Sequence, residues 1–171
     1  MSSRVREAGI GTLVPADGDE GVIMGKAIVL AEGEGQVYSA RGSELVFKAG
    51  RATTDGRFSF MDRVLPPGGR RPPRHVHVGA SEAFYVLEGE IGFWLDDETT
   101  RQGPGSFVLV PGGVSHSFAN AGPEPARVLI LHAPAMDAYF EELHDLWLSD
   151  QPPTPEAEKE LMRRHGMVTE A

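Results

Sequence analysis

The chain has 171 residues, of which 40% are hydrophobic and 24% charged, as in an ordinary globular domain of moderate size. A net charge of −9 argues against nucleic acid or an anionic membrane as a partner. With no cysteine, the chain can form neither disulfides nor thiolate metal sites.

Residues 1–20 lack hydrophobic periodicity and are expected to form an N-terminal arm, with a short strand at residues 10–14. The same segment has no apolar region typical of a secretory leader. No run of apolar residues approaches the length of a membrane span. We therefore expect a cytoplasmic protein with no membrane partner.

Residues 21–133 show short β-rich runs separated by glycine, proline and acidic turns. Many short strands at such spacing are typical of an all-β sandwich or barrel. The predicted strands cover residues 22–31, 36–39, 44–48, 57–65, 75–78, 83–88, 91–95, 99–102, 107–110, 115–119 and 127–132. Between two of these runs, Asp96 and Asp97 predict a hairpin turn.

Residues 134–171 change to helical periodicity. The apolar residues at helical spacing behind Pro134 are Met136, Tyr139, Phe140, Leu143, Leu146 and Trp147. Thr154 and Pro155 suit the N-cap and first turn of a second helix, and Gly166 suits its end. We expect both helices to cover an open face or one end of the barrel.

Three histidines and one glutamate fall where a barrel would gather them around one ion. His75 and His77 are alternate residues of a predicted strand and share a face. Glu82 opens the following strand, and His116 arrives from a distant one. Three neutral imidazoles and one carboxylate bind divalent first-row metals well and leave positions open for a substrate.

Two longer stretches around these residues resemble the signature motifs of the cupins. Gly69 to Gly89 reads G-x5-H-x-H-x4-E-x6-G, and Gly105 to Asn120 reads G-x5-P-x-G-x2-H-x3-N. In its wider pattern, the chain is most similar to the quercetin-dioxygenase-like cupins of bacteria.

The resemblance implies an all-β double-stranded β-helix, the jelly-roll barrel of the cupins, followed here by the two C-terminal helices. It also implies one divalent transition metal per chain (Fe, Mn, Ni, Co, Cu or Zn) held by His75, His77, Glu82 and His116. In quercetinase-like cupins the glutamate is both a ligand and a base for the substrate hydroxyl. Ligation alone stays open for Glu82.

Because side chains alternate between the two faces of a strand, residues on the same face as the motif residues are candidates for a substrate pocket. The alternative is that they belong to the core of the barrel. Phe84 and Val86 share a face with Glu82, while Val114 and Phe118 share one with His116. The aromatic residues that are candidates to sandwich a planar ligand, although the strand face on which they lie is ambiguous, are Phe58, Phe60, Phe93 and Trp94.

Other polar residues near the motifs have two readings each. Asn120 either ties down a turn or supports His116 from behind. Arg70, Arg71 and Arg74 either meet an anionic substrate or form a solvated loop. The histidines that lie in no ligand pattern, and are interpreted as structural or surface residues, are His132, His144 and His165.

The function implied by the resemblance is a metal-dependent dioxygenase that uses O2 to cleave a small phenolic or enol-bearing substrate. The alternatives are a non-redox isomerase, lyase or cyclase of secondary metabolism, and a small-molecule binding protein without catalysis. Exposed sheet edges and the habit of small cupins to pair barrel to barrel predict a homodimer. Its interface is expected to involve residues 1–40 and the face of Tyr85 and Leu87.

Overall fold

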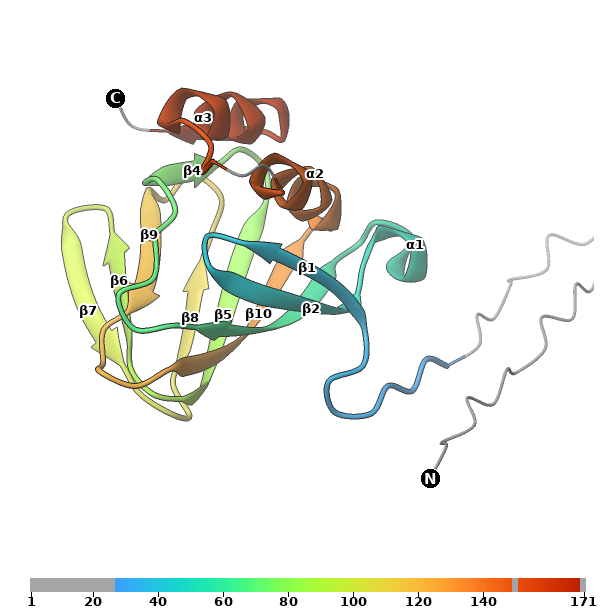
Figure 1. Ribbon diagram of the computed structural model, residues 1–171, viewed down its shortest axis with the longest axis horizontal. Coiled ribbons are helices and arrows are strands. Elements are labelled where there is room, and N and C mark those ends of the chain that lie inside the picture. The colour runs from blue at the N-terminus through green and yellow to red at the C-terminus, as the bar shows by residue number, and fades with distance from the viewer. Residues whose placement is uncertain (1–26, 149–150, 170–171) are drawn as a thin grey trace, which may run out of the picture.

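The computed structural model describes residues 27–148 and 151–169, which form two facing antiparallel sheets with two helices at one end (Figure 1). The strands are β1 (Gln36–Ala40), β2 (Ser43–Ala49), β3 (Ser59–Leu65), β4 (His75–His77), β5 (Ser81–Glu88), β6 (Ile91–Leu95), β7 (Glu98–Gln102), β8 (Phe107–Val110), β9 (His116–Asn120), β10 (Ala126–Ala133) and β11 (Met167–Thr169). The helices are α1 (Arg51–Thr54), α2 (Asp137–Trp147) and α3 (Pro155–Arg164).

The strand order is that of a jelly roll, because strands adjacent in each sheet are mostly distant in the chain. One sheet runs β1-β2-β3-β10-β5-β8 and the other β11-β4-β9-β6-β7. The predicted all-β jelly-roll fold with two C-terminal helices is therefore confirmed. Asp96 and Asp97 form the two-residue turn between β6 and β7, as expected.

Alternation of side chains places the core between the sheets. Along β10, every second residue from Ala126 to His132 is buried, and β5 buries Glu82, Phe84 and Val86 in the same way. One face of each strand is thus apolar and turned inward, as period-two patterning requires. Close to the motif residues, the inward positions become polar instead of apolar.

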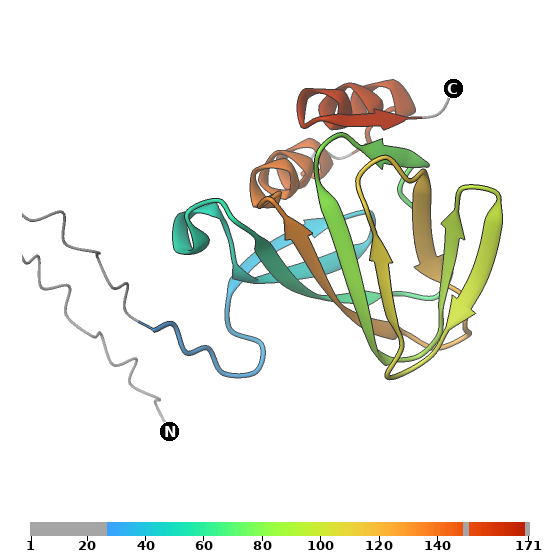
Figure 2. The same ribbon diagram turned by 180° about the vertical axis from the view of Figure 1, so that it is seen from behind.

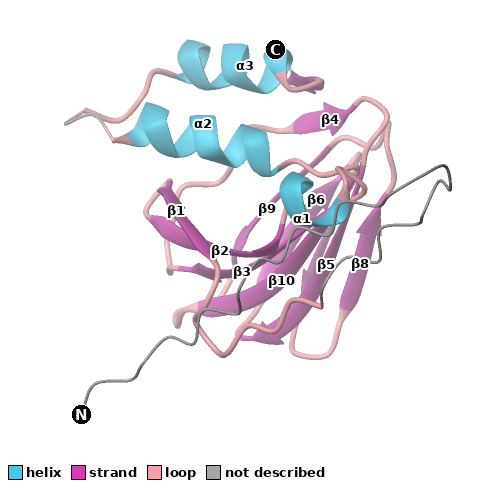
Figure 3. Cartoon of the chain, turned by 90° about the vertical axis from the view of Figure 1, so that its right-hand side faces the viewer, coloured by secondary structure: helices cyan, strands magenta, loops and turns pink. Residues whose placement is uncertain are grey.

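The helices α2 and α3 lie together over the end of the barrel that carries β4 (Figure 3). Helix α3 starts at its predicted cap, where the Thr154 side chain accepts a hydrogen bond from the Ala157 N–H at 3.2 Å. Within α3, Glu158 is fully buried and accepts a hydrogen bond from Trp147 of α2 at 2.8 Å. The Glu158 carboxylate also lies 3.4 Å from the Arg41 guanidinium of the β1–β2 turn, so it links both helices to the barrel.

The chain after α3 returns to the sheet as β11, which pairs antiparallel with β4 (Figure 2). This three-residue strand was not expected from the sequence. Nor was the single turn of α1, which begins two residues after β2. The predicted strand at 22–31 is wrong for residues 27–31, which are not extended in a ladder; its first part and residues 1–20 lie outside the described residues.

In the part of the chain that the structure describes, no helix is long and apolar enough to cross a lipid bilayer.

Candidate metal centre

The four motif residues converge inside the barrel from both sheets. His75 and His77 come from β4, and His116 lies directly opposite His75 in the paired strand β9. Glu82 reaches them from β5 in the facing sheet. All four side chains are buried, and one ligand atom of each lies within 4.8 Å of the others.

The ligand atoms that face one another are three imidazole Nε2 atoms and one carboxylate oxygen. The Nε2 atoms of His75 and His77 lie 3.3 Å apart. Glu82 Oε2 lies 3.2 Å from His77 Nε2 and 2.9 Å from His116 Nε2. Neighbouring ligands on an ion that binds nitrogen at about 2.0–2.1 Å are separated by about 3 Å, so these residues fit a first-row metal.

Backbone carbonyls fix the ring orientation of two of the histidines. His75 Nδ1 lies 2.8 Å from Pro73 O, and His116 Nδ1 lies 3.1 Å from Val114 O. Because a carbonyl can only accept, each Nδ1 carries the proton and donates it. In the neutral ring, Nε2 then presents its lone pair toward the centre, which is the tautomer that a metal ligand needs.

The local electrostatics favour deprotonated ligands at two positions. Burial, together with the neighbouring His116, lowers the pKa of His75 to about 3, so this ring is neutral at pH 7. Burial acts to raise the pKa of the Glu82 carboxyl, but the charge of His132 and hydrogen bonds from the surrounding histidines hold it well below its usual range. For His116, burial acts downward, yet the hydrogen bond with Glu82 and its charge raise the pKa.

A fourth histidine, His132 of β10, belongs to the same cluster. Its ring is 1% exposed, and its Nε2 lies 3.1 Å from Glu82 Oε1, the carboxylate oxygen opposite the one that meets His77 and His116. His132 pairs with Glu82 in the β5–β10 register. Of the two interpretations of His132, as a structural or a surface residue, burial excludes the surface one, and the contact with Glu82 was not expected. Strand parity along β10, which aligns it with buried Val128 and Ile130, was the signal that could have found it.

A small cavity adjoins the cluster and is bordered by the C-terminal helices. Its volume is about 20 Å³, enough for about one or two water-sized groups and too small for a whole organic substrate. Tyr139 and Phe140 of α2 and Met162 of α3 form part of its wall. An organic substrate therefore needs these side chains, or the helices that carry them, to move.

Of the residues nominated for the pocket, only Phe118 lines this cavity. Phe84 and Phe93 pack edge to face at 5.1 Å between ring centroids, and Phe84 packs against Phe118 at 4.8 Å. Together with Val86 they form the barrel core beneath the cluster. Val114 is partly buried and contributes its carbonyl to His116 rather than a side chain to the cavity.

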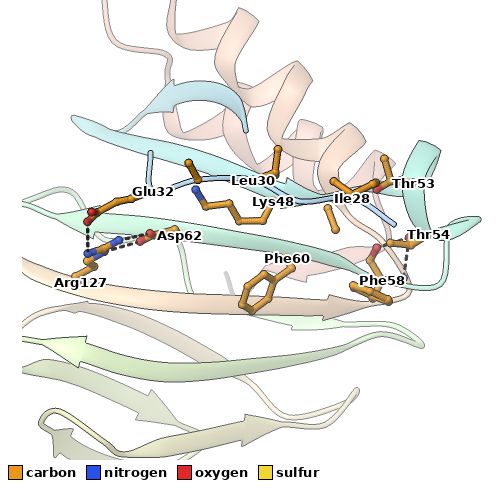
Figure 4. A pocket seen from close by; sticks show the side chains of 12 residues that line it. Ile28, Leu30, Glu32, Lys48, Thr53, Thr54, Phe58, Phe60, Asp62 and Arg127 are labelled. Atoms are coloured by element: carbon orange, nitrogen blue, oxygen red, sulfur yellow. Dashed lines mark hydrogen bonds and ion pairs between the residues drawn. The ribbon is translucent and has the colours of Figure 1, made fainter. Parts of the chain in front are cut away.

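Phe58 and Phe60 lie elsewhere, on an open pocket of about 690 Å³ outside the barrel (Figure 4). The pocket contains none of the four motif residues, and its lining also includes Ile28, Leu30, Ala31, Glu32 and Arg127. The expected role of Phe58 and Phe60 beside the metal is therefore wrong. On β3, their neighbours Ser59 and Met61 are the residues that face inward.

The remaining candidates serve local structure. Asn120 Nδ2 donates to Leu65 O at 3.0 Å and to Glu124 O at 2.7 Å, while its Oδ1 accepts from Gly122 N at 2.8 Å. Asn120 thus ties down a turn and has no hydrogen bond with His116. The Arg71 guanidinium stacks on Trp94 at 4.4 Å from the ring centroid, outside the cavity.

Known proteins resemble the part of the chain that contains this site. A family model described as "Cupin domain" matches residues 61–132, the part of the chain that contains all four motif residues and His132. The quercetin 2,3-dioxygenase of Bacillus subtilis (strain 168) is 30% identical over 117 residues, which are 68% of this chain and 34% of that protein. A Streptomyces cyaneus protein named polyketide synthase CurC is 30% identical over 94 residues, or 55% of this chain and 61% of that protein.

Two solved structures share the architecture. The polyketide cyclase RemF from Streptomyces resistomycificus gives a TM-score of 0.55 at 23% identity, over 63% of this chain and 80% of that one. A predicted oxalate decarboxylase from Thermotoga maritima gives a TM-score of 0.56 at 23% identity, over 63% of this chain and 99% of that one. At this level of identity these likenesses show the fold alone.

The barrel and its buried cluster of imidazoles and a carboxylate define a β-barrel protein with a site able to bind a metal. The chain belongs to the cupin superfamily and resembles its quercetinase-like members. It spans about a third of the length of the quercetin dioxygenase and about six-tenths of that of CurC.

Proposed function

We propose that the protein is a metal-dependent dioxygenase acting on a small phenolic or enol-bearing substrate. The observation that carries the proposal is the convergence of three Nε2 atoms and Glu82 Oε2 within one buried cluster. The likeness to quercetin 2,3-dioxygenase, in the segment that contains this cluster, supports the choice of oxygen chemistry.

His75, His77, Glu82 and His116 would hold the ion, which when bound would act as a Lewis acid and orient the substrate hydroxyl. Glu82 would also act as the general base, because its carboxylate can accept the proton of that hydroxyl. The His132 ring holds Glu82 Oε1 and so fixes the carboxylate plane while Oε2 faces the three imidazoles. Phe140 and Met162 would exclude water once the substrate is in place.

The single most informative test combines elemental analysis of the purified protein with an oxygen-electrode screen of flavonols and other enols. We expect close to one divalent metal per chain and O2 uptake that depends on both metal and substrate. Oxygen uptake that persists after removal of the metal with a chelator would contradict the proposal, as would the absence of a bound or bindable metal.

A second candidate is a non-redox cyclase or isomerase of secondary metabolism on the same barrel, and the likeness to CurC, which is named a polyketide synthase, supports a substrate of the polyketide kind. Measuring substrate conversion with and without O2 distinguishes the two candidates. A dioxygenase stops when O2 is removed, whereas a cyclase or isomerase converts its substrate at the same rate. Full-rate conversion under strict anaerobiosis would therefore replace the dioxygenase by the second candidate.

A further inference from the structure

Two arginines lie inside the barrel beside the metal cluster. Arg41 is 4% exposed and Arg63 is 3% exposed, and both line the cavity that His75, His77 and Glu82 also line. A guanidinium stays protonated at neutral pH even when it is buried. Each buried positive charge therefore needs an anionic partner, because desolvation without one costs several kcal/mol.

Arg41 has such a partner, although it shares it. Its guanidinium donates to the Tyr139 hydroxyl at 3.0 Å and lies 3.4 Å from Glu158 Oε1. The other oxygen of Glu158 lies 3.6 Å from the guanidinium of Arg70. One buried carboxylate is thus divided between two cations, and no negative charge is left over on this side of the cavity.

Arg63 has no anionic partner within 4.0 Å among the residues that the structure describes. Its Nε and one terminal nitrogen both donate to the neutral Ser43 hydroxyl, at 3.0 and 2.8 Å, and its guanidinium lies 5.7 Å from the Phe118 ring centroid. Burial, followed by the charge of Arg41, lowers the pKa of Arg63 to about 10, although the more distant charge of Glu82 acts in the opposite direction; Arg63 is still protonated at pH 7. A bound divalent ion, whose charge exceeds that of Glu82, would make the interior more positive still.

Arg63 also stands where a ligand could bridge to the metal cluster. A second small cavity, of about 10 Å³, is lined by Arg63 and by the segment Leu65, Pro66, Gly69 and Arg70. The two cavities share Arg41, Arg63, Pro72 and Phe118, which form the partition between them. A ligand held by Arg63 therefore has the His–Glu cluster on one side and the β3–β4 connection on the other.

We propose that Arg63, with Arg41 behind it, binds the carboxylate of an anionic substrate whose phenol or enol oxygen faces the His–Glu cluster. The substrate class is then a small hydroxyaromatic or enolic carboxylic acid rather than a neutral flavonol. The identity of the reacting oxygen rests on the proposed function, but the carboxylate site rests on the arginines alone. Fork-shaped guanidinium groups match carboxylates in geometry and charge.

Acetate and acetamide test this site, because they have the same size and shape and differ in charge. Their binding is measured by ligand-observed NMR in low-salt buffer, both on the metal-loaded protein and after removal of the metal. For the metal-free wild type we expect acetate to bind about tenfold to a hundredfold more tightly than acetamide. Equal binding of the two probes would overturn the proposal.

Variants of Arg63 then test whether this residue is the cause of the preference for acetate over acetamide. Arg63→Met keeps the apolar stem without the charge and should abolish the preference for acetate over acetamide. If Arg63→Met does not fold, Arg63→Gln is used in its place. Arg63→Lys keeps the charge and should retain most of the preference. Arg57→Met, at an exposed arginine paired with Asp55, is the matched control and should bind as the wild type does. A preference that survives in a folded, neutral variant of Arg63 would overturn the assignment.

The two proposals fail in different ways. Binding of acetate to the metal-free protein involves neither turnover nor O2. If the preference depends on Arg63 but no phenol or enol supports O2 uptake, the dioxygenase proposal falls and the carboxylate site stands. If neutral flavonols are oxidised and acetate binds no better than acetamide, the carboxylate site falls and the dioxygenase proposal stands.

Discussion

At the level of single residues, hydrogen bonds from the surrounding protein orient the lone pairs of the ligand atoms toward the centre of the cluster. Carbonyls of Pro73 and Val114 lock the tautomers of His75 and His116, and His132 locks the carboxylate of Glu82. The surrounding protein thus prepares the ligand atoms before an ion arrives. Preorganised ligands of this kind lose little conformational entropy on binding, which favours high affinity.

His116→Ala should lose most of the bound metal while the barrel stays folded. The substitution removes one of four ligands, but the core beneath the cluster, formed by Phe84, Phe93 and Phe118, does not depend on it. Elemental analysis and circular dichroism measure the two effects. His144→Ala, outside the cluster, is the control and should keep its metal. A His116→Ala protein that binds metal as tightly as the wild type would show that His116 is not a ligand.

Glu82→Gln should retain part of the metal affinity yet lose nearly all turnover. An amide oxygen can coordinate an ion but cannot accept a proton at neutral pH. The loss of general-base assistance should lower kcat by about 10²–10⁴-fold, measured as O2 uptake with a substrate of the wild-type protein. Glu90→Gln, at a solvent-accessible position in the turn between β5 and β6, is the control. Turnover within a few-fold of the wild type would make Glu82 a ligand only.

Metal affinity should fall as the pH is lowered. The hydrogen bond with Glu82 and its charge raise the pKa of His116 above its ordinary value of 6.5, against the effect of burial. Below this raised pKa a proton competes with the ion for the ring, so the affinity should drop by about tenfold per pH unit; above it the dependence on His116 disappears. Competition with a chelator at about pH 6 to 9 measures the profile. A constant affinity throughout would contradict the shift.

At the level of elements, the helices α2 and α3 form the lid of the barrel, and Glu158 is the residue that fastens them. Its carboxylate lies between Arg41, Arg70 and Trp147, in full burial. A charge in this position stabilises the fold only as long as its partners remain. The helices are therefore held to the barrel by the ion pairs of Glu158 and, around them, by apolar packing of Leu161 and Met162 in the core.

Glu158→Ala should lower the free energy of unfolding by about 3–5 kcal/mol, because it leaves the buried Arg41 without a carboxylate. Urea denaturation measures the change. Glu160→Ala is the matched control on the same helix, since Glu160 is exposed and pairs with the exposed Arg163; its effect should stay below about 1 kcal/mol. If both variants unfold at the same urea concentration, the buried carboxylate is not what holds the lid.

The sequence predicts the strands well because alternation reports one-sided burial, and both terminal helices because their apolar stripes are helical. It does not predict β11, whose three residues show no alternation and are extended only because β4 lies beside them. His132 and Arg63 were missed for a related reason. Each looks like a surface residue by type, and only the closure of the barrel turns it inward. The alternation of side chains along a strand assigns a face to Phe84 and Phe118 but not a depth, so it could not separate the core residue Phe84 from Phe118 in the cavity wall.

At the level of the whole molecule, the outer face of the larger sheet carries several exposed apolar side chains. Val64, Tyr85, Phe107 and Leu109 are between 44% and 63% exposed on β3, β5 and β8. Ile28, Leu30 and Glu32 border the open pocket that contains Phe58 and Phe60 (Figure 4). An exposed apolar surface of this kind is typical of a protein interface. We propose that a second copy of the chain covers it.

Light scattering should give twice the monomer mass of 18.5 kDa at micromolar concentration. Phe107→Glu should shift the protein toward the monomer, because burial of this charge against an apolar partner is unfavourable. Val168→Glu, at an exposed position on the other sheet, is the control and should remain dimeric. A wild-type mass of one chain would rule out the dimer at that concentration.

The pairing of β4 with β11 has a consequence for the time course of folding. Strand β4 carries two of the three imidazoles, and its neighbours β9 and β11 both come from much later in the chain. Contacts between residues far apart in sequence form slowly. The binding site is therefore among the last parts of the molecule to assemble. A metal ion added during refolding should leave the early collapse unchanged and act on the final step, by trapping β4 between strands that have only then arrived.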